Sequence, residues 1–269
     1  MTGRICWTMA LLLAVSPLAA PEGAERVSPE FSLTREELKA MTAGLPAGIR
    51  EVILSRPADF LHQVGAVLDQ PEDLFVLVDK QHSLAPTYVP PDLVPLKDYP
   101  LKLSWPGLKL RKAIMPAVLE MARAARADGV TLSFSSAYRS YDYQEGVFQR
   151  EVDMYGRLAA ERESAQAGHS QHQLGTAVDF GTISDDFAGT PEGRWVAAHA
   201  WEHGFSLSYP EGLESVTGYR HESWHYRYIS RPGTLLQRSF FSDVQQYLLE
   251  FLAASRAALE RRRLKPSRP

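Results

Sequence analysis

Residues of the kinds that bind zinc lie in two short segments in the second half of the chain. A catalytic zinc site takes three protein ligands, usually histidines and a carboxylate, and keeps one position open for water. It also uses a nearby carboxylate that is not a ligand to take a proton from that water. His172, Asp179 and His225 can supply the ligands, and Glu222 can supply the base. The sequence therefore predicts a zinc-dependent hydrolytic site.

The spacing of these residues restricts the backbone around them. Positions three apart in an ideal strand point to opposite faces, so Glu222 and His225 converge only if the chain turns between them. We expect Glu222 in the loop just before a strand that carries His225. Gly175 allows the backbone to bend between His172 and Asp179.

Two motifs resemble those of a known family, the VanY-type D-alanyl-D-alanine carboxypeptidases. These are zinc peptidases of class M15, related in fold to the hedgehog signalling domain and the lysostaphin-type enzymes. The motifs are Ser170-x-His172-x-x-Gly175-x-Ala177-x-Asp179 and Glu222-x-x-His225, with Trp224 before the histidine. The stretch Ser136-x-Tyr138-Arg139-Ser140 and Gln144 also match, and the resemblance covers about residues 74–230.

The resemblance implies roles for single residues. It implies one Zn²⁺ per chain on His172, Asp179 and His225, with Glu222 as the general base. Arg139 would hold the scissile carbonyl oxygen and the charge that develops on it. The substrate-binding residues would be Ser136, Ser170, Tyr138, Gln144 and Trp224.

Some of these residues also have plain structural interpretations. Ser136 and Ser170 are common turn or capping residues, and Trp224 could be a core or pocket-wall residue. Gln171 stands where an acidic residue is frequent in the family, and Ala167 stands where proline is frequent. Neither position is a ligand or a base, so these departures bear on substrate preference.

The function that the resemblance implies is hydrolysis of the terminal D-alanine from peptidoglycan stem peptides by a secreted zinc carboxypeptidase. An L,D-carboxypeptidase or a cell-wall endopeptidase would use the same residues, and a non-catalytic wall-binding module could keep the zinc site. A serine penicillin-binding enzyme has no support, because the chain has no Ser-x-x-Lys motif with a Lys-Thr-Gly partner.

Composition limits the alternatives further. The 269 residues are 45% hydrophobic and 23% charged, which suits one globular domain with appendages. The net charge of −3 gives no support to nucleic-acid binding. The single cysteine, Cys6, excludes intramolecular disulfides and cysteine-rich zinc sites. Beyond residue 24 no apolar run reaches the roughly 18 residues that a membrane span needs.

The first 24 residues have the layout of a secretory signal peptide. Arg4 is followed by a short apolar stretch over residues 5–15 and then by small residues. We expect export to the periplasm or cell-wall space, with cleavage near residues 19–24. An uncleaved membrane anchor is the alternative.

The remaining pattern predicts an α+β fold with a small, mainly antiparallel sheet and flanking helices, and the resemblance implies that this fold is like that of hedgehog and the D-Ala-D-Ala peptidases. We expect an N-terminal helical segment over 25–71, a catalytic domain over 72–232, and a C-terminal helix with a basic tail over 233–269. The expected helices span 111–127, 143–165, 191–203 and 235–263. The expected strands span 74–78, 130–135, 177–180, 205–209 and 224–229.

The C-terminal helix carries a broad apolar stripe and a basic end. The stripe either packs on the rest of the protein or docks on a membrane surface or a partner. The stripe consists of Leu236, Phe240, Val244, Leu248, Phe251 and Leu252. The sequence does not specify an oligomeric state.

Overall fold

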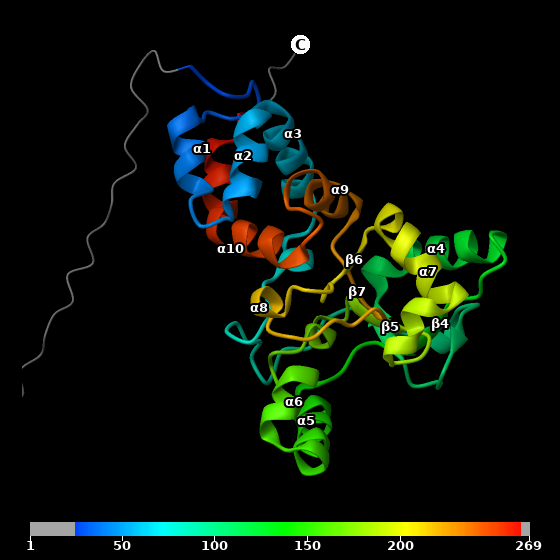
Figure 1. Ribbon diagram of the computed structural model, residues 1–269. Coiled ribbons are helices and arrows are strands. Elements are labelled where there is room, and N and C mark those ends of the chain that lie inside the picture. The colour runs from blue at the N-terminus through cyan, green and yellow to red at the C-terminus, as the bar shows by residue number, and fades with distance from the viewer. Residues whose placement is uncertain (1–24, 265–269) are drawn as a thin grey trace, which may run out of the picture.

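The computed structural model describes residues 25–264, which form an α+β fold around a five-stranded sheet (Figure 1). The strand order is β2-β4-β5-β7-β6, and only the β2–β4 pair is parallel. The predicted fold class, with a small and mainly antiparallel sheet, is therefore confirmed. The strands are β2 (Lys102–Leu103), β4 (Ser133–Ser136), β5 (Ala177–Phe180), β6 (Phe205–Leu207) and β7 (His225–Tyr228).

The register of the three central strands brings residues of the predicted site next to one another. Asp179 on β5 lies opposite Ser136 on β4 and opposite His225 on β7. All four residues of β5 are buried, as expected of a strand covered on both faces. A separate two-stranded ribbon pairs β1 (Leu93–Pro95) with β3 (Lys109–Arg111).

Helices α4 (Met115–Ala127) and α7 (Pro191–His199) lie beside one end of the sheet (Figure 1). The predicted helix from residue 111 begins four residues later, because residues 109–111 form β3 and Pro116 occupies the first turn. Thr190 caps α7 by accepting a hydrogen bond from Gly193 N, as its position before Pro191 predicts.

The expected helix over 143–165 is two helices, α5 (Tyr141–Tyr155) and α6 (Arg157–Glu163). Gly156 separates them with φ of 80° and ψ of 158°, a conformation open almost only to glycine. The two helices pack on each other as a hairpin that projects from the body of the protein (Figure 1).

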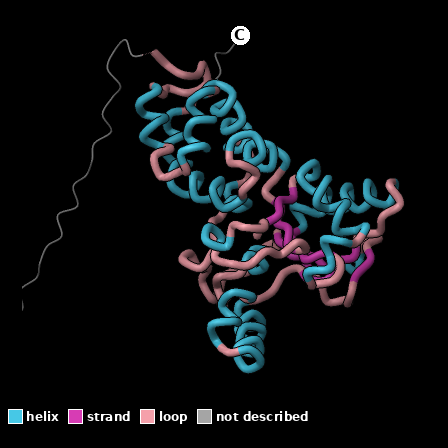
Figure 2. Tube along the Cα trace, in the orientation of Figure 1, coloured by secondary structure: helices cyan, strands magenta, loops and turns pink. Residues whose placement is uncertain are grey.

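The N-terminal and C-terminal helices form one group, which we call the helical lobe. It contains α1 (Arg35–Met41), α2 (Ala47–Ser55), α3 (Pro57–Leu68), α9 (Arg231–Phe240) and α10 (Gln245–Arg262). Figure 2 shows these helices together on one side of the strands. The lobe and the sheet share one hydrophobic core, so the two parts are packed together. The basic end of α10 pairs with the N-terminal segment, through Arg262 with Glu37 and Arg263 with Asp69.

The single C-terminal helix expected over 235–263 is broken between α9 and α10. Ser242 and Asp243 adopt φ of 53° and 58°, and the Gln237 amide donates to the Asp243 carbonyl at 2.9 Å. All six residues of the predicted apolar stripe are buried. The stripe therefore packs internally.

The apolar run Leu74–Val78 is not the predicted strand. Residues Glu72–Phe75 form a short 3₁₀ helix. The carbonyls of Leu74 and Val76 accept hydrogen bonds from Arg227 Nη2 at 3.0 Å and 2.8 Å. A buried side chain thus satisfies backbone groups that a neighbouring strand would otherwise pair.

The predicted signal peptide and the last five residues of the basic tail lie outside the described residues. Within residues 25–264, every helix is too short or too polar to cross a bilayer.

Candidate metal centre and active site

Three side chains form a buried cluster at the centre of the sheet. One ligand atom from each of His172, Asp179 and His225 lies within 4.8 Å of the others. His172 comes from a short 3₁₀ helix that ends at Gly175, where φ is 67°. This left-handed turn lets the chain enter β5 and bring Asp179 beside its partner histidines. The structure thus brings together all three predicted zinc ligands.

The donor groups of the cluster suit zinc. The Nδ1–H of His172 donates to the Ala137 carbonyl at 2.7 Å, which leaves Nε2 unprotonated, with a lone pair directed toward the cluster. This Nε2 lies 3.2 Å from Asp179 Oδ2. Asp179 Oδ1 is buried and accepts no hydrogen bond, although it lies 3.2 Å from His225 Nδ1. Two imidazoles and a carboxylate with an unsatisfied oxygen form a fitting zinc donor set.

The protonation states also favour metal binding, which requires neutral imidazole and ionised carboxylate. Burial and the adjacent Arg139 guanidinium lower the pKa of His172 to about 4. Burial alone would raise the pKa of Asp179, but His172 and His225 outweigh burial and hold that pKa well below its usual range.

Glu222 lies beside the cluster without belonging to it. It precedes β7 in a loop, as expected, and its carbonyl accepts from His225 N at 3.3 Å. This turn directs Glu222 Oε2 to 3.4 Å from His225 Nδ1. Burial, reinforced by the Asp179 carboxylate, raises the pKa of Glu222 to about 8.

Arg139 is held firmly against the cluster. Its Nη2 donates to His172 Nε2 at 3.0 Å and to Asp179 Oδ2 at 2.9 Å. Its Nε donates to Ser136 Oγ at 3.0 Å, and its Nη1 donates to Gln144 Oε1 at 3.1 Å. A preorganised positive charge therefore faces the same space as the ligands and Glu222.

That space is a pocket of about 880 Å³. It is lined by the three cluster residues, Glu222 and Arg139, together with four of the five predicted substrate contacts: Ser136, Tyr138, Ser170 and Trp224.

The fifth predicted substrate contact, Gln144, lies outside the pocket lining and is buried. Its amide donates to the Ala165 carbonyl at 2.7 Å and accepts from Arg139. Gln144 therefore orients Arg139, and its predicted contact with the substrate stays a prediction. Ser170 has a local role as well, since its Oγ accepts from His172 N at 3.3 Å.

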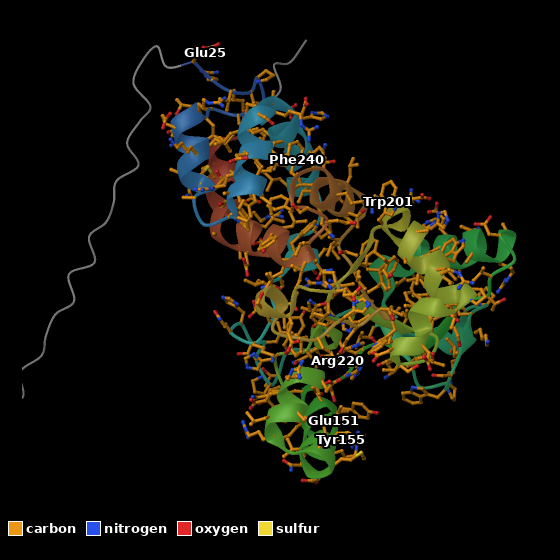
Figure 3. All side chains as sticks on the ribbon, in the orientation of Figure 1. Glu25, Glu151, Tyr155, Trp201, Arg220 and Phe240 are labelled. Atoms are coloured by element: carbon orange, nitrogen blue, oxygen red, sulfur yellow. The ribbon has the colours of Figure 1, made fainter. Side chains whose placement is uncertain are left out.

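One wall of the pocket is formed by the α5–α6 hairpin and another by the loop before β7. Figure 3 shows Glu151 and Tyr155 on the hairpin and Arg220 above them, and all three line the pocket. Arg220 pairs with Glu163 of the hairpin, and its guanidinium carbon lies 5.3 Å from the centre of the Trp224 ring. The hairpin and the loop are thus tied together at the pocket wall.

Two residues near the metal centre were not foreseen from the sequence. The ring centre of Tyr209 lies 4.8 Å from that of His225, and burial raises the pKa of Tyr209 well above its usual value. Gln171 lies behind His225, outside the pocket lining, so it does not bear on substrate preference through direct contact. No motif or spacing pointed to either role.

The chain is similar to proteins of known family. Residues 107–231 match the family model of VanY, D-alanyl-D-alanine carboxypeptidase. YodJ of Bacillus subtilis (strain 168) is 34% identical over 187 residues, which cover 67% of this chain and 68% of YodJ. The chain spans 56% and 60% of the length of two matching D-alanyl-D-alanine carboxypeptidases, from Enterococcus faecium and Enterococcus faecalis.

Solved structures show the same likeness. The LdcB LD-carboxypeptidase has a TM-score of 0.60 and 32% identity, over 69% of this chain and 88% of that one. A variant of the vancomycin-resistance D,D-pentapeptidase VanY, in complex with Zn(II), has a TM-score of 0.55 and 29% identity. That match covers 67% of this chain and 99% of the VanY chain.

Proposed function

Because the chain belongs to the VanY family of D-alanyl-D-alanine carboxypeptidases, we propose that it removes the terminal D-alanine from peptidoglycan stem peptides in a zinc-dependent reaction. The observation that carries this proposal is the placement of Glu222 and Arg139 around the buried His172–Asp179–His225 cluster, at the inner end of one pocket. A domain that only binds the cell wall would not need a buried carboxylate and a fixed guanidinium beside its metal ligands.

His172, Asp179 and His225 would hold one zinc ion. A zinc ion held there supplies Lewis acidity toward water and toward the peptide carbonyl. The His172 ring is fixed by the Ala137 carbonyl, and Asp179 is fixed by Arg139. Both ligands are therefore oriented by the fold before any ion binds.

Glu222 is the general base in this proposal. The nearby positive charge of a zinc ion would favour the ionised form of Glu222 and so offset the effect of burial on its pKa. The carboxylate takes a proton from the attacking water as the new carbon–oxygen bond forms. It then delivers that proton to the nitrogen of the departing D-alanine as the carbon–nitrogen bond breaks. One water is consumed, and a shortened peptide and free D-alanine are produced.

Arg139 stabilises the negative charge that develops on the carbonyl oxygen. Its guanidinium is fixed by Ser136 and Gln144 before substrate arrives, so little reorganisation accompanies the reaction. Donors of this kind are worth on the order of 10²–10³ in rate.

The protein would act outside the cytoplasm, in the periplasm or cell-wall space. The basis for this part of the proposal is the apolar stretch within residues 1–24 and the location of the substrate in the wall.

An L,D-carboxypeptidase is the second candidate, and the similarity to LdcB favours it. It would use the same ligands, base and guanidinium, and would differ in the chirality of the residue before the scissile bond. The pocket walls from the hairpin and from Trp105 would make that selection.

Mass spectrometry of stem peptides tests both candidates. The purified protein is incubated with a pentapeptide ending in D-Ala-D-Ala and with the tetrapeptide, each with and without a chelator. Loss of one alanine from the pentapeptide, abolished by chelation and restored by zinc, is the expected result. Loss from the tetrapeptide alone would assign the L,D-activity, and no cleavage by zinc-loaded protein would refute both.

A further inference from the structure

A chain of buried hydrogen bonds joins the helical lobe to the metal centre. His225 Nε2 lies 3.3 Å from Gln171 Oε1, which also accepts from Ser208 Oγ at 2.7 Å. The other end of the same amide, Gln171 Nε2, donates to Gln245 Oε1 at 3.2 Å. Gln245 is the first residue of α10, and its own Nε2 donates to the Ser206 carbonyl at 3.3 Å.

Every side chain in this network is withdrawn from solvent. Gln171 is 3% exposed, Ser208 3% and Gln245 1%. Gln171 and Gln245 also lie outside the lining of the pocket, so neither touches a substrate held there. An unpaired buried amide costs about 1–3 kcal/mol. The network therefore has a strong preference for the arrangement in which each amide is paired.

The network acts on the nitrogen of His225 that does not face the cluster. His225 Nδ1 points to Asp179 and Glu222, at 3.2 Å and 3.4 Å. If Nδ1 binds the metal, the proton of the neutral imidazole is on Nε2, and this N–H donates a hydrogen bond to Gln171 Oε1. Partners of this kind set the tautomer and orientation of a ligating histidine, and their loss typically costs 10–100-fold in metal affinity.

The hydrogen bond to Gln245 determines which end of the Gln171 amide faces His225. Because Gln245 Oε1 accepts from the Gln171 amino group, the Gln171 carbonyl oxygen must turn toward His225 and Ser208. The reversed amide would place two donors, Gln171 Nε2 and His225 Nε2, against each other, and two acceptor oxygens at Gln245.

We propose that Gln171 and Gln245 are positioning residues for His225, through which the helical lobe sets the metal affinity of the site. This inference rests on the metal centre of the proposed function. Residues 107–231, which match the family model, contain Gln171 but not Gln245. The proposal therefore makes a helix outside the matched region a working part of the metal site.

The test measures the zinc dissociation constant of full-length variants by competition with a chelator of known affinity. Gln171→Met removes the acceptor while nearly keeping the volume, and we expect the dissociation constant to rise 10–100-fold. Gln171→Glu loses the donor to Gln245 Oε1, but a carboxylate presents an acceptor oxygen to His225 Nε2 whichever way it turns, so we expect its dissociation constant within threefold of wild type. If Gln171 only filled space, Gln171→Met would bind zinc more tightly than Gln171→Glu, because methionine fits an apolar gap better than a buried carboxylate does.

Gln245→Met tests whether α10 affects the metal site through its contact with Gln171, and Gln246→Met is its matched control. Gln246 is the next residue on α10, is 7% exposed and donates to Asp79 Oδ2 at 2.8 Å, away from the cluster. We expect the zinc dissociation constant to rise 3–20-fold in Gln245→Met and to change less than twofold in Gln246→Met. Thermal unfolding of the metal-free variants shows whether the two substitutions cost comparable stability.

A double-mutant cycle then separates a shared path from independent effects. Gln245 Oε1 contacts Gln171 Nε2 at 3.2 Å and Ser208 Oγ at 3.4 Å. Since the proposal routes its effect on the His225 ring through Gln171, Gln171→Met with Gln245→Met should bind zinc no more weakly than Gln171→Met alone. The cobalt-substituted proteins give a second readout, because a reoriented His225 changes the visible absorption bands of Co²⁺.

An unchanged dissociation constant in Gln171→Met, or the same loss in Gln171→Glu, would overturn the role of Gln171. Additive effects in the double variant, or equal effects of Gln245→Met and Gln246→Met, would overturn the role of α10. These failures differ from a failure of the proposed function, which would appear as wild-type protein that binds no zinc.

Discussion

Replacement of Glu222 by glutamine is the sharpest test of the base assignment. Glutamine has the same shape as glutamate, and the side chain is almost fully buried, so the substitution leaves no cavity. What changes is the capacity to accept a proton. A positioned general base contributes about 10²–10⁴ in rate, which corresponds to about 3–5 kcal/mol of activation free energy.

The geometry also predicts what Glu222→Gln leaves unchanged. Glu222 stands outside the cluster of potential ligand atoms, with Oε2 3.4 Å from His225 Nδ1. We therefore expect the zinc content and zinc affinity to stay within about threefold of wild type. Removal of a true ligand would cost far more. KM should change little, because the loss falls on proton transfer rather than on binding.

The assay is release of D-alanine from the pentapeptide, followed at several substrate concentrations to separate kcat from KM. Glu192→Gln is the control, since Glu192 is a half-buried carboxylate that accepts from Ser133 N and lies outside the pocket. It should keep wild-type kcat. A Glu222→Gln enzyme with kcat within tenfold of wild type would refute the base role. Loss of zinc from that variant would instead make Glu222 a ligand.

Four other outcomes follow from the structure. His172→Ala should bind no stoichiometric zinc by elemental analysis, because it removes a ligand whose neutral form is already favoured by its low pKa. Arg139→Gln should lower kcat by about 10²–10³ in the same D-alanine assay, as expected for loss of a preorganised donor. Gly156→Ala should lower the free energy of unfolding by about 1–3 kcal/mol in chemical denaturation, because φ of 80° with ψ of 158° strains any side chain there. Deletion of residues 231–269 should abolish the single cooperative thermal transition, because it removes buried core side chains including Phe240; a folded, soluble product would contradict the packing of α9 and α10.

The metal ligands could be predicted from the sequence because few residue types bind zinc and the motifs fix their spacing. Four of the five strands of the sheet were predictable too, since runs such as β5 and β7 are apolar or aromatic and bounded by turns, whereas the two-residue strand β2 was not. The break between α9 and α10 was not, because neither glycine nor proline marks it and the apolar period continues across it. Ser242 and Asp243 take positive φ there, which aspartate tolerates better than most residues.

The role of Gln144 shows a different limit of sequence reasoning. A motif tells which residues occur together, but not whether a side chain faces the substrate or a neighbouring residue. Gln144 lies in the first turn of α5, where Ser140 caps the helix, and its amide is aimed at Arg139. That contact with Arg139 is a role that the motif alone did not reveal.

The hydrogen bonds that reach His225 from α10 are further from any sequence signal. Gln171 and Gln245 are separated by 74 positions, and glutamine is a common surface residue with no preferred spacing to its partners. Only packing of the helical lobe on the sheet makes both amides buried and forces them to pair. A protein cut to residues 107–231 would keep all three ligands, Glu222 and Arg139, yet would leave the Gln171 amide without its partner. It follows that the ligand set alone does not determine the metal affinity of this chain, and that the helical lobe is part of the physical description of the site.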